Sequence, residues 1–247
     1  MKKFKRVLAL AMAVILSVPT IITTGMGTVP VKAAGDTVEL TVSSESAKYA
    51  GYETRKMYAG GNYAYCVQPS KKTPQSGTYE KHYDVENYVS NAGDETQAVQ
   101  SRNLAYYCWG APGFNASYFP STWYDGSAMD DDKYIALSHI MLSFLVSYDA
   151  VGSMHGCNSS FKNWVYQNVL GYNANGDLVN GQATLPILCW SAAPASFKVY
   201  ILSTGSATQN ILGYEYTPTG TVSLSKTSAN TGITSGNSCY SLAGAVY

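Results

Sequence analysis

The chain has 247 residues, of which 46% are hydrophobic and only 13% are charged, and its 16 basic and 16 acidic side chains give no formal net charge. Five of the 16 basic residues and none of the 16 acidic ones lie in residues 1–34, so the remainder holds 11 basic and 16 acidic residues and a charge of about −5. Nucleic-acid binding depends on clustered Lys and Arg that neutralise phosphates, so this balance excludes nucleic acid as an expected partner.

Residues 1–34 have the order of a secretory signal peptide. Four basic residues within 2–6 precede an apolar run over 7–22, and small residues then lead to a predicted cleavage site near Ala33 or Ala34. The apolar run has about 16 residues, fewer than the roughly 20 that a transmembrane helix needs. We therefore predict a secreted protein rather than one held in a membrane by its N-terminus.

The first elements after this segment are predicted to be strands. Residues 36–42 alternate between apolar and polar side chains, which favours a half-buried strand. Residues 51–67 indicate one or two further strands, interrupted by Gly60-Gly61. The polar segment 69–77 contains two prolines and two lysines and is predicted to be a surface loop.

Three helices are predicted next, over 92–107, over 134–148 and from Asn158 or Ser159 to near Gly171. Asp130, Asp131 and Asp132 precede the second helix, where they can cap it and complement its dipole. Strand-like composition then returns over 185–190, 197–203 and 211–216.

Strands that flank a helical middle indicate a fold of the α+β class. We predict one β-rich domain with a helical insertion over 36–216, rather than alternating βαβ units. Residues 217–220 are interpreted as a hinge. Residues 221–226 are interpreted as the opening strand of a further unit, of which residues 221–247 are too few to bury a core alone.

Five cysteines in a secreted chain leave at least one without an intramolecular disulfide partner. Cys66 is the candidate, because it ends a predicted strand in the aromatic setting Tyr-Ala-Tyr-Cys-Val-Gln-Pro. The alternative is a disulfide from Cys66 to one of the next three cysteines. A partner of the fifth cysteine, Cys239, can lie beyond Tyr247. Disulfide pairing stays open for Cys108, Cys157, Cys189 and Cys239.

Three segments together resemble the thioester domain of Gram-positive surface adhesins, and they are Tyr65–Pro69, Tyr106–Gly113 and Thr208–Leu212. In that family a cysteine after an aromatic residue is joined to a glutamine in a Gln-x-apolar-apolar pattern near the end of the domain. The resemblance implies that Cys66 and Gln209 form this internal thioester. Water would hydrolyse such a bond, and Tyr63, Tyr65 or Trp109 are predicted to wall it off.

The same resemblance implies how the protein works. A primary amine on a protein or glycan of a host or neighbouring cell would attack the thioester and take the acyl group in a single turnover. The implied role is a cell-surface adhesin for host attachment, self-modifying rather than enzymatic. No cofactor and no metal ion are expected.

The central helix departs from the family pattern. The family commonly carries Thr-Gln-x-Ala there, whereas residues 136–142 read Ala-Leu-Ser-His-Ile-Met-Leu and place His139 where the glutamine is expected. Residues 96–99 read Thr-Gln-Ala-Val but lie on the preceding helix, so the role is not transferred to Gln97. His139 is instead a candidate general base for Cys66 or the incoming amine, with a buried structural histidine as the alternative.

Two segments of the tail, Gly220–Lys226 and Ser241–Tyr247, resemble the first two strands of a Cna-B or SpaA-type pilin β-sandwich. In that family a lysine of the first strand forms an intramolecular isopeptide bond with an asparagine of the last strand. Lys226 is the matching residue. Its partner is expected beyond Tyr247, as is the region that attaches the protein to the cell wall.

Two other functions compete with this interpretation. A secreted cysteine hydrolase or transpeptidase could use Cys66 as nucleophile and His139 as base, since such a dyad forms in space rather than in sequence. A non-covalent binding module could hold Cys66 in a disulfide. Intact mass separates the three, because a thioester loses about 17 Da as ammonia, a disulfide loses about 2 Da and a free thiol loses nothing.

Overall fold

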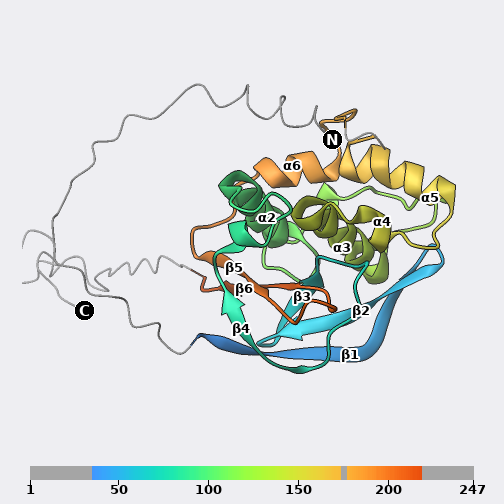
Figure 1. Cartoon of the computed structure of the whole chain (residues 1–247). Helices are drawn as coiled ribbons and strands as arrows, with labels where there is room; N and C mark the ends of the chain where they lie inside the picture. Colours follow the sequence, from blue (N-terminus) through green and yellow to red (C-terminus); the bar gives the residue numbers. More distant parts are fainter. Residues whose placement is uncertain (1–34, 174–176, 219–247) are drawn as a thin grey trace, which may run out of the picture. The chain divides into compact units, whose positions relative to one another are not determined.

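The computed structural model describes residues 35–173 and 177–218, and within them six strands close into an antiparallel barrel. Their order around the barrel is β1-β2-β3-β6-β5-β4. The strands are β1 (Thr37–Tyr49), β2 (Tyr52–Ala59), β3 (Asn62–Cys66), β4 (Gly77–His82), β5 (Phe197–Leu202) and β6 (Ile211–Tyr216). The helices all come between β4 and β5 in the sequence (Figure 1), so the predicted α+β class with a helical insertion is confirmed.

All three predicted helices are present, together with shorter ones. Asp94 caps the first, Asp130 caps the second by accepting from the Lys133 N–H, and Asn158 caps the third. The α-helices are α2 (Glu95–Tyr107), α3 (Asp131–Ser147), α4 (Ala150–Ser153), α5 (Ser159–Trp164) and α6 (Thr184–Trp190). The 3₁₀-helices η2 (Val85–Asn87) and η3 (Ala116–Tyr118) and the π-helix η4 (Val165–Leu170) complete the set within the described ranges.

The strand predicted over 185–190 is wrong, because this segment forms helix α6. Leu185, Leu188 and Cys189 are buried at the spacing of one helix face, and Pro186 lies in the first turn, where its missing N–H costs nothing. A short apolar run cannot be told from a strand by its periodicity, and here its packing against α2 selects the helix.

The loop predicted over 69–77 leads directly into β4, which begins at Gly77 and was not predicted from the sequence. The side chains of β4 are exposed or half-buried, so its sequence lacks the apolar alternation that marks a strand. It closes the barrel by pairing with both β1 and β5. The first strand also runs on to Tyr49, past a register shift between Val42 and Ser46.

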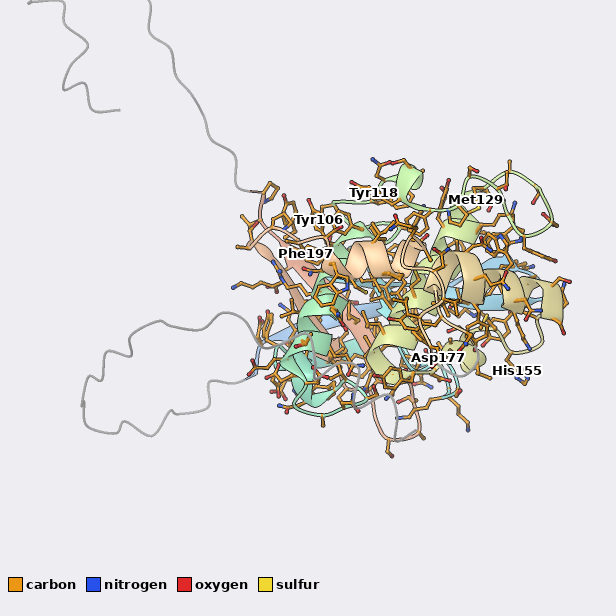
Figure 2. The ribbon with its side chains drawn as sticks, turned by 90° about the horizontal axis from the view of Figure 1, so that it is seen from above. Tyr106, Tyr118, Met129, His155, Asp177 and Phe197 are labelled. Carbon is orange, nitrogen blue, oxygen red and sulfur yellow. The ribbon has the colours of Figure 1, made fainter. Side chains whose placement is uncertain are left out.

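The helices cover one side of the barrel, with α3 packed against β1 and β3 (Figure 1). Alternate residues of β3 therefore face two different cores. Tyr63 and Tyr65 pack with the helices, whereas Ala64 and Cys66 pack inside the barrel. Figure 2 looks down on the helical layer, where Tyr106 of α2 meets Phe197 of β5 with ring centroids 5.1 Å apart.

By its internal contacts the chain separates into two units, Met1–Tyr216 and Thr217–Tyr247. The predicted domain limits stay predictions. The signal peptide predicted over 1–34, the isopeptide residue Lys226 and Cys239 all lie outside the described residues. Within the described ranges, every helix is too short or too polar to cross a membrane.

Candidate functional site

Cys66 ends β3 and presents its thiol inside the barrel. Only 4% of the residue is exposed, and it packs among apolar side chains that include Leu40 and Ile211. Its Sγ lies 3.8 Å from Thr54 Oγ1 on the neighbouring strand β2. Its backbone carbonyl accepts a hydrogen bond of 3.2 Å from the Ser143 hydroxyl, which binds this end of β3 to helix α3.

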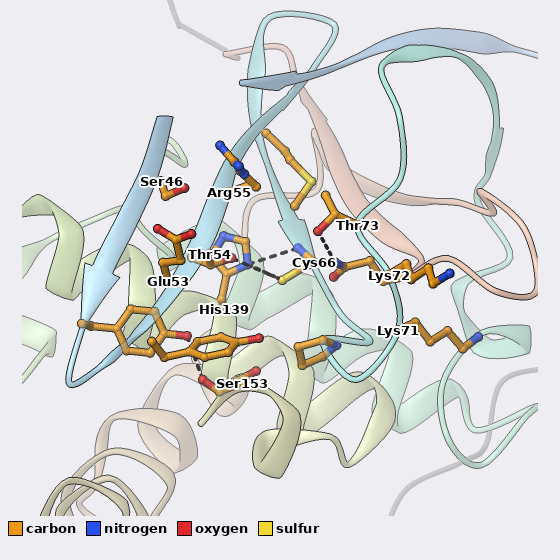
Figure 3. Close-up of a pocket in the computed structure, with 15 residues that line it drawn as sticks. Ser46, Glu53, Thr54, Arg55, Cys66, Lys71, Lys72, Thr73, His139 and Ser153 are labelled. Atoms are coloured by element: carbon orange, nitrogen blue, oxygen red, sulfur yellow. Dashed lines mark hydrogen bonds between the residues drawn. The ribbon is translucent and has the colours of Figure 1, made fainter. Parts of the chain in front are cut away.

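His139 projects from α3 onto the same strand end and is 1% exposed. Its Nδ1 lies 2.9 Å from Cys66 Sγ and 3.2 Å from the Cys66 backbone nitrogen (Figure 3). A backbone N–H can only donate, so Nδ1 is the unprotonated nitrogen and the proton of the neutral ring is on Nε2. Nε2 donates to the Tyr63 hydroxyl over 3.2 Å. The ring is therefore fixed as one tautomer, with its lone pair toward the thiol.

Burial keeps both members of this pair uncharged. It raises the pKa of the Cys66 thiol to about 12, although the Thr54 hydrogen bond acts in the opposite direction. Burial also lowers the pKa of His139 to about 4, against the hydrogen bond from the Cys66 backbone. At pH 7 the pair is a thiol beside a neutral imidazole, whereas cysteine proteases rely on a thiolate beside a protonated histidine.

Aromatic side chains wall the pair on the helical side. The His139 ring lies edge-on to Tyr63 and Tyr65, with centroids 5.9 and 5.7 Å away. Tyr63 in turn contacts Trp109 at 5.1 Å, and the Tyr65 hydroxyl donates to the Trp109 carbonyl. These are the three residues that the sequence predicted around the cysteine, and their packing limits the access of water from that side.

Gln209 reaches the site through the pairing of β3 with β6. Cys66 stands opposite Ile211 in the register, which places Gln209 two positions before the partner of the cysteine. Gln209 is 6% exposed, and its Nε2 lies 3.4 Å from Thr73 Oγ1. Its Oε1 has no hydrogen-bond partner among the described residues. One long hydrogen bond therefore holds this amide, and its carbonyl oxygen is left without a donor among the described residues.

Cys66, His139 and Gln209 line one cavity of about 270 Å³ (Figure 3). These three side chains are buried, whereas the charged residues that line the same cavity are exposed and form its rim. The charged residues of the rim are Glu53, Arg55, Lys71 and Lys72. The cavity thus connects a buried thiol and a buried amide to a polar, charged entrance.

The other cysteines take no part in this cavity. Cys108, Cys157 and Cys189 are buried free thiols, as is Cys66, so the described part of the chain holds no disulfide. The alternative in which Cys66 belongs to a disulfide therefore gains no support. No group of three His, Cys, Asp or Glu side chains in residues 35–173 and 177–218 is arranged to hold a metal ion.

Gln97, which lies in the Thr-Gln-Ala-Val segment of the preceding helix, does not line the cavity. Its Nε2 donates to the Ser90 hydroxyl over 2.9 Å and to the Leu145 carbonyl, and its Oε1 accepts from the Asn91 N–H. Gln97 thus joins the start of α2 to the end of α3.

The sequence missed two residues of the site. Thr54 and Thr73 contact Cys66 and Gln209 with their hydroxyl groups, yet neither stands in a motif. The closeness of Thr73 to Cys66 in the sequence was the only available signal. Thr54 could be found only from the pairing of strands.

A family model described as a thioester domain matches residues 37–175, which is more than half of the chain. The matched range includes Cys66 and His139 but ends before Gln209. The assignment of Gln209 therefore depends on the β3–β6 pairing and on the shared cavity. No curated protein and no solved structure is similar enough to this chain to be matched with it.

We expect Cys66 to resist alkylation in the folded Gln209→Ala variant, which lacks the neighbouring amide. With a pKa of about 12, its thiolate fraction at pH 8 is on the order of 10³-fold below that of an ordinary thiol, and labelling should slow accordingly. Iodoacetamide labelling, followed by mass spectrometry of the Cys66 peptide, measures the rate, and urea-unfolded protein is the control. Equal rates in folded and unfolded protein would mean that His139 ionises the thiol.

We also expect His139 to make the fold less stable in mild acid. Its pKa of about 4 lies below the ordinary value of 6.5, so between these values the unfolded chain binds a proton that the folded chain does not. The stabilisation is complete above pH 6.5 and is lost as the pH falls toward 4, by about 3 kcal/mol in total.

Urea unfolding at pH 7 and pH 4.5 measures this loss in the wild type and in His139→Gln. The wild type should lose about 2 to 3 kcal/mol more than the variant, because both share every other titrating group. Equal losses would show that His139 titrates in the folded protein as it does in the unfolded chain.

Proposed function

Because the chain belongs to the thioester domain family, we propose that Cys66 and Gln209 form an internal thioester that captures amines covalently. The observation that carries this proposal is the single cavity in which a buried thiol, a buried amide and an imidazole with its unprotonated Nδ1 beside the thiol meet. These three groups are the nucleophile, the acyl donor and the proton carrier that the reaction needs.

Formation of the thioester joins Cys66 Sγ to Gln209 Cδ and breaks the bond from Cδ to Nε2. The thiol proton has to leave sulfur and reach the departing nitrogen, which leaves as ammonia. His139 Nδ1 lies 2.9 Å from Sγ and can carry that proton while Nε2 keeps its hydrogen bond to Tyr63. The imidazole is neutral again when ammonia has left.

Capture reverses the direction of proton transfer. A neutral primary amine attacks Gln209 Cδ, the bond from Cδ to Sγ breaks, and the amine is left as a secondary amide on Gln209. The proton that the amine loses passes through His139 Nδ1 to Sγ and restores the Cys66 thiol. Each molecule reacts once, because a stable amide has replaced the thioester.

A cysteine hydrolase is the second candidate, and the Sγ–Nδ1 distance of 2.9 Å favours it as much as it favours a thioester. The charge states do not favour it, since both groups are neutral at pH 7. The partner of Nε2 is the phenol of Tyr63, where catalytic triads place a group that stabilises an imidazolium.

The setting of the reaction is part of the proposal. A signal peptide over 1–34 would send the protein out of the cell, and an isopeptide-forming pilin domain beginning near Gly220, with Lys226 as its bonding lysine, would form the start of a stalk. The domain would then act as an adhesin on the cell surface or cell wall, with an amine of a host or neighbouring cell as its target.

Intact mass tests the thioester directly. Wild-type protein should weigh about 17 Da less than its sequence, and incubation with methylamine should add about 31 Da to that species. Cys66→Ala and Gln209→Ala should show neither change, because each removes one half of the bond. Cys189→Ala and Gln182→Ala are matched controls that should keep both changes, since neither residue lines the cavity.

A wild-type mass equal to that of the sequence, with no methylamine adduct, would exclude the thioester. If the protein also cleaved ester or amide substrates repeatedly in that state, the hydrolase would be the better explanation.

His139→Gln should slow methylamine capture by about 10²–10⁴-fold, the usual cost of losing general acid–base help. His155→Gln, at an exposed histidine outside the cavity, is the matched control and should react at the wild-type rate. Rates are followed by mass from pH 5 to 8, and circular dichroism checks the fold. A His139→Gln protein with the wild-type rate and pH dependence would remove His139 from the mechanism.

A further inference from the structure

The charges at the entrance of the cavity are divided unevenly between its two sides. On the β2 side, Glu53 and Arg55 are both exposed and carry opposite charges, so they balance. On the other side, Lys71 and Lys72 are both exposed and both positive. Figure 3 shows this division, with the two lysines on one side of Cys66 and Glu53 on the other.

Neither lysine of the positive side forms an ion pair within the described residues. None of the ion pairs found there includes Lys71 or Lys72. Asp149, which precedes α4, contacts this loop, and its carboxylate accepts hydrogen bonds from the Ser70 N–H, the Ser70 hydroxyl and the Gly152 N–H. Asp149 forms no ion pair with either lysine, but it keeps its negative charge, so the two lysines and this acid together leave one positive charge on this side.

The backbone of the two lysines is also held beside Gln209. The Lys71 N–H donates to the Gln68 carbonyl over 2.9 Å, which closes a turn. The Lys72 carbonyl accepts from the Gln209 N–H over 2.9 Å, so the backbone of Lys72 is bonded to the residue that carries the acyl carbon. An incoming amine must therefore approach Gln209 beside these positive charges.

We propose that this entrance selects lysine amines that are flanked by carboxylates on the target, an inference that rests on the proposed amine capture. Carboxylates beside the target lysine would pair with Lys71 and Lys72 while the lysine side chain enters the cavity. The same cations lower the pKa of an amine that comes near them and so favour its neutral, nucleophilic form. A target segment rich in Lys and Arg is repelled.

The test uses three acetylated five-residue peptides with one central lysine, flanked on both sides by Glu, by Gln or by Arg. Each peptide has a single primary amine, so the rate of adduct formation reports only the flanking charge. At about 20 mM salt the rates should fall in the order Glu, Gln, Arg, with about three- to tenfold between the extremes. At about 0.5 M salt the order should nearly disappear, because screening shortens the reach of exposed charges.

The Lys71→Gln/Lys72→Gln double variant should reduce the difference at low salt to within about twofold. Lys198→Gln removes an exposed lysine of β5 that does not line the cavity, and it should keep the wild-type order. Equal peptide rates in the wild type at low salt, or an unchanged order in the double variant, would overturn the charge selection.

Methylamine, which has no flanking groups, tests the proposed thioester function separately from the charge selection. If the wild type captures methylamine but does not rank the peptides, only the charge selection is wrong. If it captures neither methylamine nor any peptide, the proposed thioester function fails, and the selection fails with it.

Discussion

The pairing of β3 with β6 is the constraint on which the rest of the site depends. The Val67 N–H donates to the Asn210 carbonyl over 3.1 Å, and the Gln68 side chain accepts from the Asn210 N–H over 3.2 Å. These bonds fix the register in which Cys66 stands opposite Ile211. A slip by one residue would turn Gln209 to the other face of the strand, away from the thiol. The barrel therefore positions two side chains that come from opposite ends of the domain.

The helical layer adds what the barrel alone lacks. His139 from α3 supplies an acceptor beside Cys66, and the tyrosines of β3 and Trp109 enclose its ring. Both acid–base groups stay neutral because they are buried, which suits a bond that has to survive until one target arrives. A permanently ionised pair would favour repeated hydrolysis and would shorten the lifetime of a single thioester.

Sequence patterns predicted most of the helices and strands but not the closure of the strands into a barrel. The caps of the long helices and the Gly60-Gly61 turn between β2 and β3 are local signals, and those elements were predicted correctly. The missed strand β4 and the misassigned helix α6 are decided by packing, which a short segment does not encode. In the site, Cys66 and His139 could be identified as candidates from the residues around them in the sequence. The tautomer of His139, the hydroxyl contacts of Thr54 and Thr73, and the neutral charge states appear only when the elements are brought together.

The position of Gln209 just before β6 also determines how a captured target would be held under tension. In the proposed product the target would be bonded to the side chain of Gln209, so a pull between the target and Thr217 would run along the covalent backbone of β6 (Ile211–Tyr216). That strand is paired on both sides, by β3 and β5, and because it is already extended its covalent bonds would carry the load while the hydrogen bonds to its neighbours would not. The helices that build the reactive site would carry none of this force. Once the amide has formed, unfolding of the rest of the domain would neither release the target nor lengthen the tether by much, because the segment under tension is already extended.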